Sequence, residues 1–146
     1  MPRILVVDDD EQIRFMLRII LDRAGYDVQV APDGKEALAH LAAHPTDLVI
    51  LDIIMPGKEG IQTIIELRRD FPDLKIIAIS GGGYISAQKY LVSAVEFGAD
   101  LTLAKPISRV DMLQAVRDLI GEGILEENSP GDGSDPADSQ QKEAEN

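Results

Sequence analysis

DLVILDIIMPG, residues 47–57, is an apolar run that meets an acid and then a Pro-Gly pair. Apolar residues without polar alternation indicate a parallel strand that is buried on both faces, and the Pro-Gly pair indicates that the strand stops abruptly. Because burying an unpaired carboxylate is costly, an acid at this point is expected to have a function. The sequence therefore predicts a buried strand at residues 48–51 and singles out Asp52.

Three other apolar runs also end in polar residues. They are residues 4–7 before Asp8-Asp9-Asp10, residues 76–79 before Ser80 and three glycines, and residues 101–104 before Lys105. If the four strands are parallel neighbours, their carboxyl ends meet at one edge of the sheet, where open α/β sheets bind ligands. Carboxylates, a hydroxyl and an ammonium group are therefore expected to converge there.

Strands and helices are predicted to alternate five times along the chain. The predicted strands are residues 3–7, 27–30, 48–51, 75–79 and 101–104, and the predicted helices are residues 10–24, 34–43, 61–70, 85–97 and 109–120. Strict alternation with apolar strands predicts an α/β fold whose parallel sheet is covered by helices on both faces. Asp33 and Ser108 are predicted N-caps, and Gly25, Gly98 and Gly121 are predicted left-handed residues after helix ends.

Composition limits the class of protein. A chain of 146 residues with 45% apolar residues is expected to form one domain, and the absence of cysteine excludes disulfides and thiolate metal sites. A net charge of -12 argues against direct DNA binding, which needs a basic face. The chain enters a predicted strand at residue 3, which leaves no room for a signal peptide, and no apolar run is long enough for a membrane span. We therefore expect a soluble, cytoplasmic protein without membrane contact.

The charge is concentrated near the C-terminus. From Glu122 onward there are eight acids and one base, Lys142, so residues 122–146 contribute a charge of -7. After Leu125 the chain contains almost nothing to bury, and residues 126–146 are predicted to be disordered. The predicted organisation is a domain at residues 1–121 followed by an acidic tail at residues 122–146.

The polar strand ends, in this order, resemble the receiver domain of bacterial two-component response regulators. The matching pieces are ILVVDDD at residues 4–10, DIIMPG at residues 52–57 with Gly60, Ser80-Gly81, and Lys105-Pro106. The resemblance covers roughly residues 3–121. It implies a flavodoxin-like three-layer sandwich with strand order 2-1-3-4-5, two helices on one face and three on the other.

The resemblance also implies roles for the acids. Asp52 would be the phosphoacceptor, since a carboxylate can accept an activated phosphoryl group as an aspartyl phosphate. Asp8 and Asp9 would bind Mg²⁺, or Mn²⁺ in its place, together with Asp52 and the backbone carbonyl of Ile54. Asp10 is instead predicted to be the N-cap of the first helix.

The remaining site residues would contact the phosphoryl group and couple phosphorylation to a conformational change. Lys105 would pair with the phosphoryl oxygens, and the Lys105–Pro106 peptide bond would be cis; Ser80 and Gly81 would bind the group and move with it. The alternative for Lys105 is a solvated lysine at a strand end, and the alternative for Ser80 is an ordinary loop residue. The family usually has an aromatic residue where this chain has Thr102, so the switch is expected in the loop at residues 81–88, the fourth helix and the fifth strand.

The first helix carries two apolar surfaces. One stripe is predicted to face the sheet and consists of Ile13, Leu17, Ile20, Leu21 and Ala24. Phe15, Met16 and Ile19 fall on its flank or back and are predicted to form a partner surface, although single exposed apolar residues are ordinary. His40, His44 and the pair Arg68-Arg69 are predicted to be solvated.

The predicted function is that of a single-domain response regulator. A sensor histidine kinase or histidine phosphotransfer protein would be the phosphodonor, and a downstream protein would be the target, with no enzymatic activity beyond self-phosphorylation and autodephosphorylation. One alternative is a haloacid-dehalogenase phosphatase, which needs an acid two residues after its nucleophile, where this chain has Ile54. A second alternative is a phosphorylation-independent scaffold, whose expected sign would be a missing acid or lysine, and none is missing.

Overall fold

A five-stranded parallel sheet forms the centre of the computed structural model, which describes residues 1–53, 60–81, 92 and 94–123. The strand order is β2-β1-β3-β4-β5, as predicted. The strands are β1 (Arg3–Val7), β2 (Asp27–Ala31), β3 (Leu48–Asp52), β4 (Lys75–Ser80) and β5 (Leu101–Ala104). The helices are α1 (Glu11–Arg23), α2 (Gly34–Ala43), α3 (Gly60–Asp70) and α5 (Arg109–Ile120). Each of these bounds differs from the predicted one by at most one residue.

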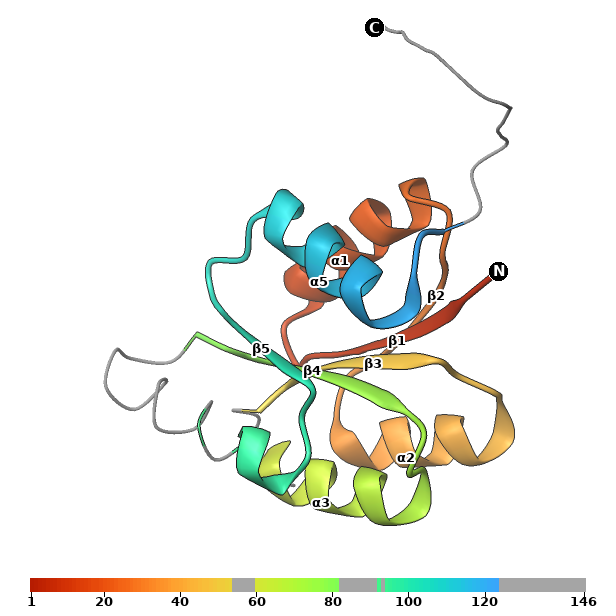
Figure 1. Cartoon of the computed structure of the whole chain (residues 1–146), viewed down its shortest axis with the longest axis vertical. Coiled ribbons are helices and arrows are strands. Elements are labelled where there is room, and N and C mark those ends of the chain that lie inside the picture. Colours follow the sequence, from red (N-terminus) through yellow and green to blue (C-terminus); the bar gives the residue numbers. More distant parts are fainter. Residues whose placement is uncertain (54–59, 82–91, 93, 124–146) are drawn as a thin grey trace, which may run out of the picture.

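The helices form two layers around the sheet (Figure 1). Helices α1 and α5 cover one face, and α2 and α3 cover the other. The fourth helix, predicted at residues 85–97, is described only at Val92 and residues 94–97, which are helical; Ala94 packs in the core shared by α2 and α3. Ile54, the loop at residues 82–88 and the predicted disordered segment at residues 126–146 lie outside the described residues.

The sheet separates two hydrophobic cores because successive strand residues point to opposite faces. In β1, Leu5 and Val7 belong to the core under α2 and α3, whereas Ile4 and Val6 belong to the core under α1 and α5. All four are at most 1% exposed. The central strands are therefore buried on both faces, which explains their uninterrupted apolar sequence.

Helix α1 presents different residues to the sheet and to solvent. Leu17 and Leu21 are fully buried, and Ile13 and Ala24 pack against the same core, while Ile20 is only partly buried. On the outer side, Phe15 is 66% exposed, Met16 is 37% exposed, and Ile19 is partly buried. Among the described residues, no helix combines the length and the apolarity that crossing a bilayer requires.

The predicted helix ends are confirmed. Three N-cap side chains accept hydrogen bonds from backbone N–H groups, namely Asp10 from Gln12, Asp33 from Glu36 and Ser108 from Asp111. Gly25, Gly98 and Gly121 have φ values of 96°, 132° and 80°. These residues lie just after helical segments, and an L side chain would be strained at these positive φ values.

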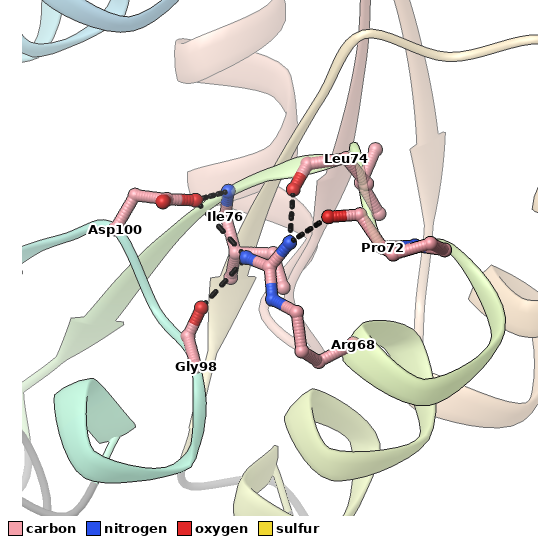
Figure 2. A network of polar contacts seen from close by, with 6 residues as sticks. All are labelled: Arg68, Pro72, Leu74, Ile76, Gly98 and Asp100. Atoms are coloured by element: carbon pink, nitrogen blue, oxygen red, sulfur yellow. Dashed lines mark hydrogen bonds and ion pairs between the residues drawn. The ribbon is translucent and has the colours of Figure 1, made fainter.

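Arg68 is not the solvated residue that the sequence predicted. Its guanidinium donates hydrogen bonds to the carbonyl oxygens of Pro72, Leu74 and Gly98, at 2.7–2.9 Å, and to the Asp100 carboxylate at 3.1 Å (Figure 2). The same carboxylate accepts the backbone N–H of Ile76 at 2.8 Å. Arg68 thereby joins the end of α3, the turn into β4 and the turn into β5. Arg69, in contrast, forms its ion pair with its neighbour Asp70.

Candidate functional site

The side chains of Asp8, Asp52 and Lys105 lie on the same face of the sheet. Val7 pairs in register with Leu51, so Asp8 and Asp52 follow at the same level on neighbouring strands. Both continue the alternation of residues that point toward α1 and α5. Lys105 continues the same alternation in β5, where Leu101 and Leu103 pack against that core. Strand period and register together therefore bring two acids and a base to one point.

Lys105 bridges the two buried acids. Its Nζ lies 3.0 Å from Oδ2 of Asp8 and 3.1 Å from Oδ2 of Asp52. Asp8 is 0% exposed and Asp52 is 4% exposed. Asp9 is exposed, yet one carboxylate oxygen from each of Asp8, Asp9 and Asp52 lies within 4.8 Å of the other two. Three carboxylates and one ammonium leave a formal charge of -2 in this cluster.

Burial dominates the electrostatics of Asp8. It raises the pKa of the carboxyl group, and this effect is only partly offset by the Asp10 N–H, which donates to Oδ1 at 2.9 Å, and by Lys105. Burial acts in the opposite sense on Lys105, but the Asp8 and Asp52 carboxylates outweigh it and raise the pKa of the ammonium. Lys105 is therefore protonated at neutral pH, whereas burial disfavours the carboxylate form of Asp8.

The acid cluster has the donors that a hard divalent cation requires. Oδ2 of Asp8 is buried and faces Lys105 Nζ without the alignment of a hydrogen bond, so it retains the capacity to accept another ligand. Oxygen donors from one to three carboxylates, completed by water, suit Mg²⁺. The residues present thus fit the cation that the sequence predicted; the predicted carbonyl ligand of Ile54 lies outside the described residues.

Ser80 lies at the same edge of the sheet. By the period of two along β4, its side chain belongs to the opposite face, with those of Ile76 and Ala78. It is fully buried, and its Oγ has no hydrogen-bond partner among the described residues. A buried hydroxyl without a partner is costly in a folded protein. Its Oγ therefore retains the capacity to bind a further polar group at this edge.

Gly81 makes room for the lysine. A Cβ atom at this position would lie 2.6 Å from Cδ and 2.7 Å from Cβ of Lys105. The backbone N–H of Lys105 donates to the Ser80 carbonyl at 2.8 Å, which holds the two strand ends together. Only glycine therefore lets the Lys105 side chain pass β4 toward the acids. The sequence singled out Gly81 as a residue that binds the phosphoryl group, and it held no signal for this steric role.

Two further contacts shape the site. A Cβ atom at Gly60 would lie 2.1 Å from Cα of Ile53, so α3 begins directly against the backbone that follows Asp52. Arg14 donates from Nη1 to the Asp8 carbonyl at 2.7 Å, a contact for which the sequence offered no signal. The Lys105–Pro106 peptide bond is cis, as the resemblance implied.

Comparison with known families and structures agrees with this geometry. Residues 4–117 match the family described as the response regulator receiver domain. Response regulator MprA of Mycolicibacterium vanbaalenii is 37% identical over 132 residues, which is 90% of this chain and 54% of that protein. The chain thus spans about half the length of the curated relatives that it matches.

Solved structures share the fold. Chemotaxis protein CheY4 of Vibrio cholerae aligns with a TM-score of 0.74 at 29% identity, over 82% of this chain and 99% of that one. Response regulator protein TrrA of Thermotoga maritima, solved in complex with Mg(2+)-BeF, aligns with a TM-score of 0.73 at 36% identity, over 82% of this chain and 100% of that one. The flavodoxin-like arrangement predicted from the sequence is confirmed.

Proposed function

Because this chain belongs to the response regulator receiver domain family of two-component systems, we propose that it accepts a phosphoryl group on Asp52. The donor is a sensor histidine kinase or a histidine phosphotransfer protein, and the reaction takes place in the cytoplasm. The phosphoacceptor domain comprises residues 1–121, and residues 122–146 form an acidic tail. The observation that carries the proposal is the ammonium of Lys105, which lies 3.0 Å and 3.1 Å from carboxylates of Asp8 and Asp52.

The transfer itself needs little covalent chemistry from the protein. A carboxylate oxygen of Asp52 attacks phosphorus, the P–N bond to the donor imidazole breaks, and the electron pair of that bond returns to the imidazole nitrogen. A bound Mg²⁺ would neutralise charge on the phosphoryl oxygens, and Asp8, Asp9, Asp52 and the Ile54 carbonyl would hold it. Lys105 supplies a further positive charge beside the oxygens as negative charge develops there.

Ser80 and Lys105 are the residues through which phosphorylation would act on the rest of the domain. The unpartnered Oγ of Ser80 is available to donate to a phosphoryl oxygen, which gives the phosphorylated state a contact that the free state lacks. Thr102 replaces the usual aromatic residue, so the change is expected at residues 81–88, the fourth helix and β5. Hydrogen exchange with and without beryllofluoride tests this: protection changes confined to Thr102 and β5 would exclude the loop as the moving part.

The exposed outer side of α1 is the proposed docking surface for the donor. Phe15 and Met16 are exposed, and Ile19 lies partly buried beside them. A mostly apolar patch on a helix that starts beside Asp8 and Asp9 suits a partner that must bring a phosphohistidine to the site. A downstream protein is the proposed target of the phosphorylated domain.

Intact-mass measurement after incubation with acetyl phosphate tests the proposed function. The parent chain is expected to gain the mass of one phosphoryl group in the presence of Mg²⁺, and to gain none when the cation is chelated. Asp52→Asn should remain unmodified under both conditions. A phosphoryl group on Asp52→Asn at the parent rate would overturn the assignment of Asp52, and sustained turnover of a small phosphorylated substrate would point to the phosphatase alternative instead.

A further inference from the structure

A groove runs along α1 beside β2 and has a volume of about 450 Å³. Its lining residues are Glu11, Gln12, Arg14, Phe15, Arg18 and Val30. Arg14 and Arg18 are four residues apart, so their guanidinium groups extend from the same side of the helix. Phe15, 66% exposed, lies between them in sequence. The groove thus combines an apolar ring with two cations and one acid, Glu11.

Neither cation of this groove has an acidic partner in the described part of the chain. Arg3, Arg68 and Arg69 form ion pairs with aspartates, whereas Arg14 donates only to a backbone carbonyl and Arg18 forms no ion pair there. Glu11 offsets one of the two arginines, so the lining carries a formal charge of +1 in a protein whose net charge is -12. The groove is therefore complementary to an acidic segment.

The chain itself contains such a segment. Residues 126–138 include five acids and no base, interspersed with Gly, Ser and Pro. The described chain ends at Gly123, close to the C-terminal end of α1: a Cβ atom at Gly123 would lie 2.3 Å from the Ala24 carbonyl oxygen. The Tyr26 hydroxyl donates to the Gly121 carbonyl at 2.7 Å and fixes this exit point.

The acidic segment is long enough to reach the groove. Arg18 and Arg14 lie six and ten residues before Ala24, which corresponds to about 9 Å and 15 Å along the helix axis. Asp132 lies nine residues after Gly123, and a flexible chain of that length has a root-mean-square span of at least about 15–18 Å. Tethering at this length gives an effective concentration in the millimolar range, at which weak charge pairing is sufficient for occupancy.

We propose that residues 126–138 bind intramolecularly in the groove formed by Arg14, Phe15 and Arg18. The inference extends the proposed function, because Phe15 belongs to the proposed donor surface, and a bound tail would have to be displaced before the phosphodonor docks. The acids pair with the two arginines, so occupancy should fall as ionic strength rises. Acetyl phosphate does not use this surface, and its reaction should be indifferent to the tail.

Paramagnetic relaxation in the full chain tests the interaction. The sequence contains no cysteine, so a nitroxide attached to Ser134→Cys labels the tail at one position. Enhanced relaxation is expected at the amides of residues 14–18. It should fall at least threefold with Arg18→Gln or in 0.5 M salt, and it should persist with Arg69→Gln, which removes an exposed arginine on the opposite layer.

The outcomes separate the proposal from its rivals. Relaxation that is the same with Arg18→Gln and Arg69→Gln would overturn it, since the tail would then pass the helix without binding the groove. Enhancement transferred to an unlabelled copy in a mixed sample would assign the groove to the tail of a second molecule and would also overturn it. No phosphoryl group is used in this experiment, so failure of Asp52 to accept phosphate would leave its result unchanged.

Discussion

Replacing Asp8 by asparagine should stabilise the metal-free protein. With an effective dielectric constant of about 20, the pair with Lys105 at 3.0 Å favours the carboxylate by about 5.5 kcal/mol. Repulsion from Asp52, no more than 4.8 Å away, opposes it by at least about 3.5 kcal/mol. Desolvation of a fully buried carboxylate costs several kcal/mol more, roughly 3–5. Asparagine keeps an acceptor oxygen for the Asp10 N–H, so the difference rests on these three effects, and Asp8→Asn should raise the free energy of unfolding by about 1–3 kcal/mol at pH 7.

The sign of the pH dependence follows from the same carboxyl group. Because burial raises its pKa in the folded state, the folded protein holds this proton more tightly than the unfolded chain does. Its contribution to stability is present at acid pH and is lost as pH rises through the folded-state pKa. Asp8→Asn has no such group, so its advantage over the parent should be small in acid and grow toward neutral pH. Lys105 would still pair with Asp52, so the substitution does not leave a buried charge alone.

Urea denaturation with and without Mg²⁺ measures both effects. Mg²⁺ should stabilise the parent, by about 1.4 kcal/mol at ten times its Kd, and should stabilise Asp8→Asn much less. Asp9→Asn is the matched control: its carboxylate is exposed, so metal-free stability should change less while the response to Mg²⁺ also falls. A metal-free Asp8→Asn that is less stable than the parent would refute the dominance of burial. A variant with the parent's response to Mg²⁺ would refute Asp8 as a ligand.

Three further predictions address other parts of the structure. Arg68→Ala should lower the free energy of unfolding by about 2–4 kcal/mol in urea denaturation because it leaves several backbone carbonyls without donors; Arg69→Ala should change it little, and equal losses would contradict the network. Gly81→Ala should displace the Lys105 side chain and slow phosphorylation by acetyl phosphate by about tenfold to a hundredfold, whereas an unchanged rate would mean that the lysine passes β4 freely. Serine at Phe15, Met16 and Ile19 should slow transfer from the protein donor tenfold or more and spare acetyl phosphate; equal loss with both donors would indicate damage to the fold.

The fold could be predicted from the sequence because its strands are apolar throughout and end in polar residues at one edge of the sheet. The strand and helix bounds predicted for the described elements differ from the observed ones by at most one residue. Asp10, Asp33 and Ser108 were predictable as N-caps because a short polar side chain just before an amphipathic segment can accept a backbone N–H of the first helical turn. These features are local in sequence, so local patterns were sufficient to predict them.

Contacts between segments that are distant in the sequence could not be predicted in the same way. Arg68 was predicted to be solvated because arginine near a helix end usually is, yet its partners come from the turn at Pro72 and from Gly98 and Asp100. The steric need for Gly81 depends on the path of Lys105, 24 residues later in the chain. Such contacts depend on how segments that are far apart in the sequence lie in space, and local sequence patterns do not show this.

The most direct test of the central claim is to locate the phosphoryl group. After reaction with acetyl phosphate and Mg²⁺, borohydride reduction converts an acyl phosphate to an alcohol, and peptide mapping identifies the reduced residue. The conversion is predicted at Asp52 alone, at the end of β3 beside Asp8 and Lys105. Reduction at Asp8 or Asp9, or a phosphoryl group that resists borohydride because it is carried by Ser80, would contradict the assignment of Asp52 as the phosphoacceptor.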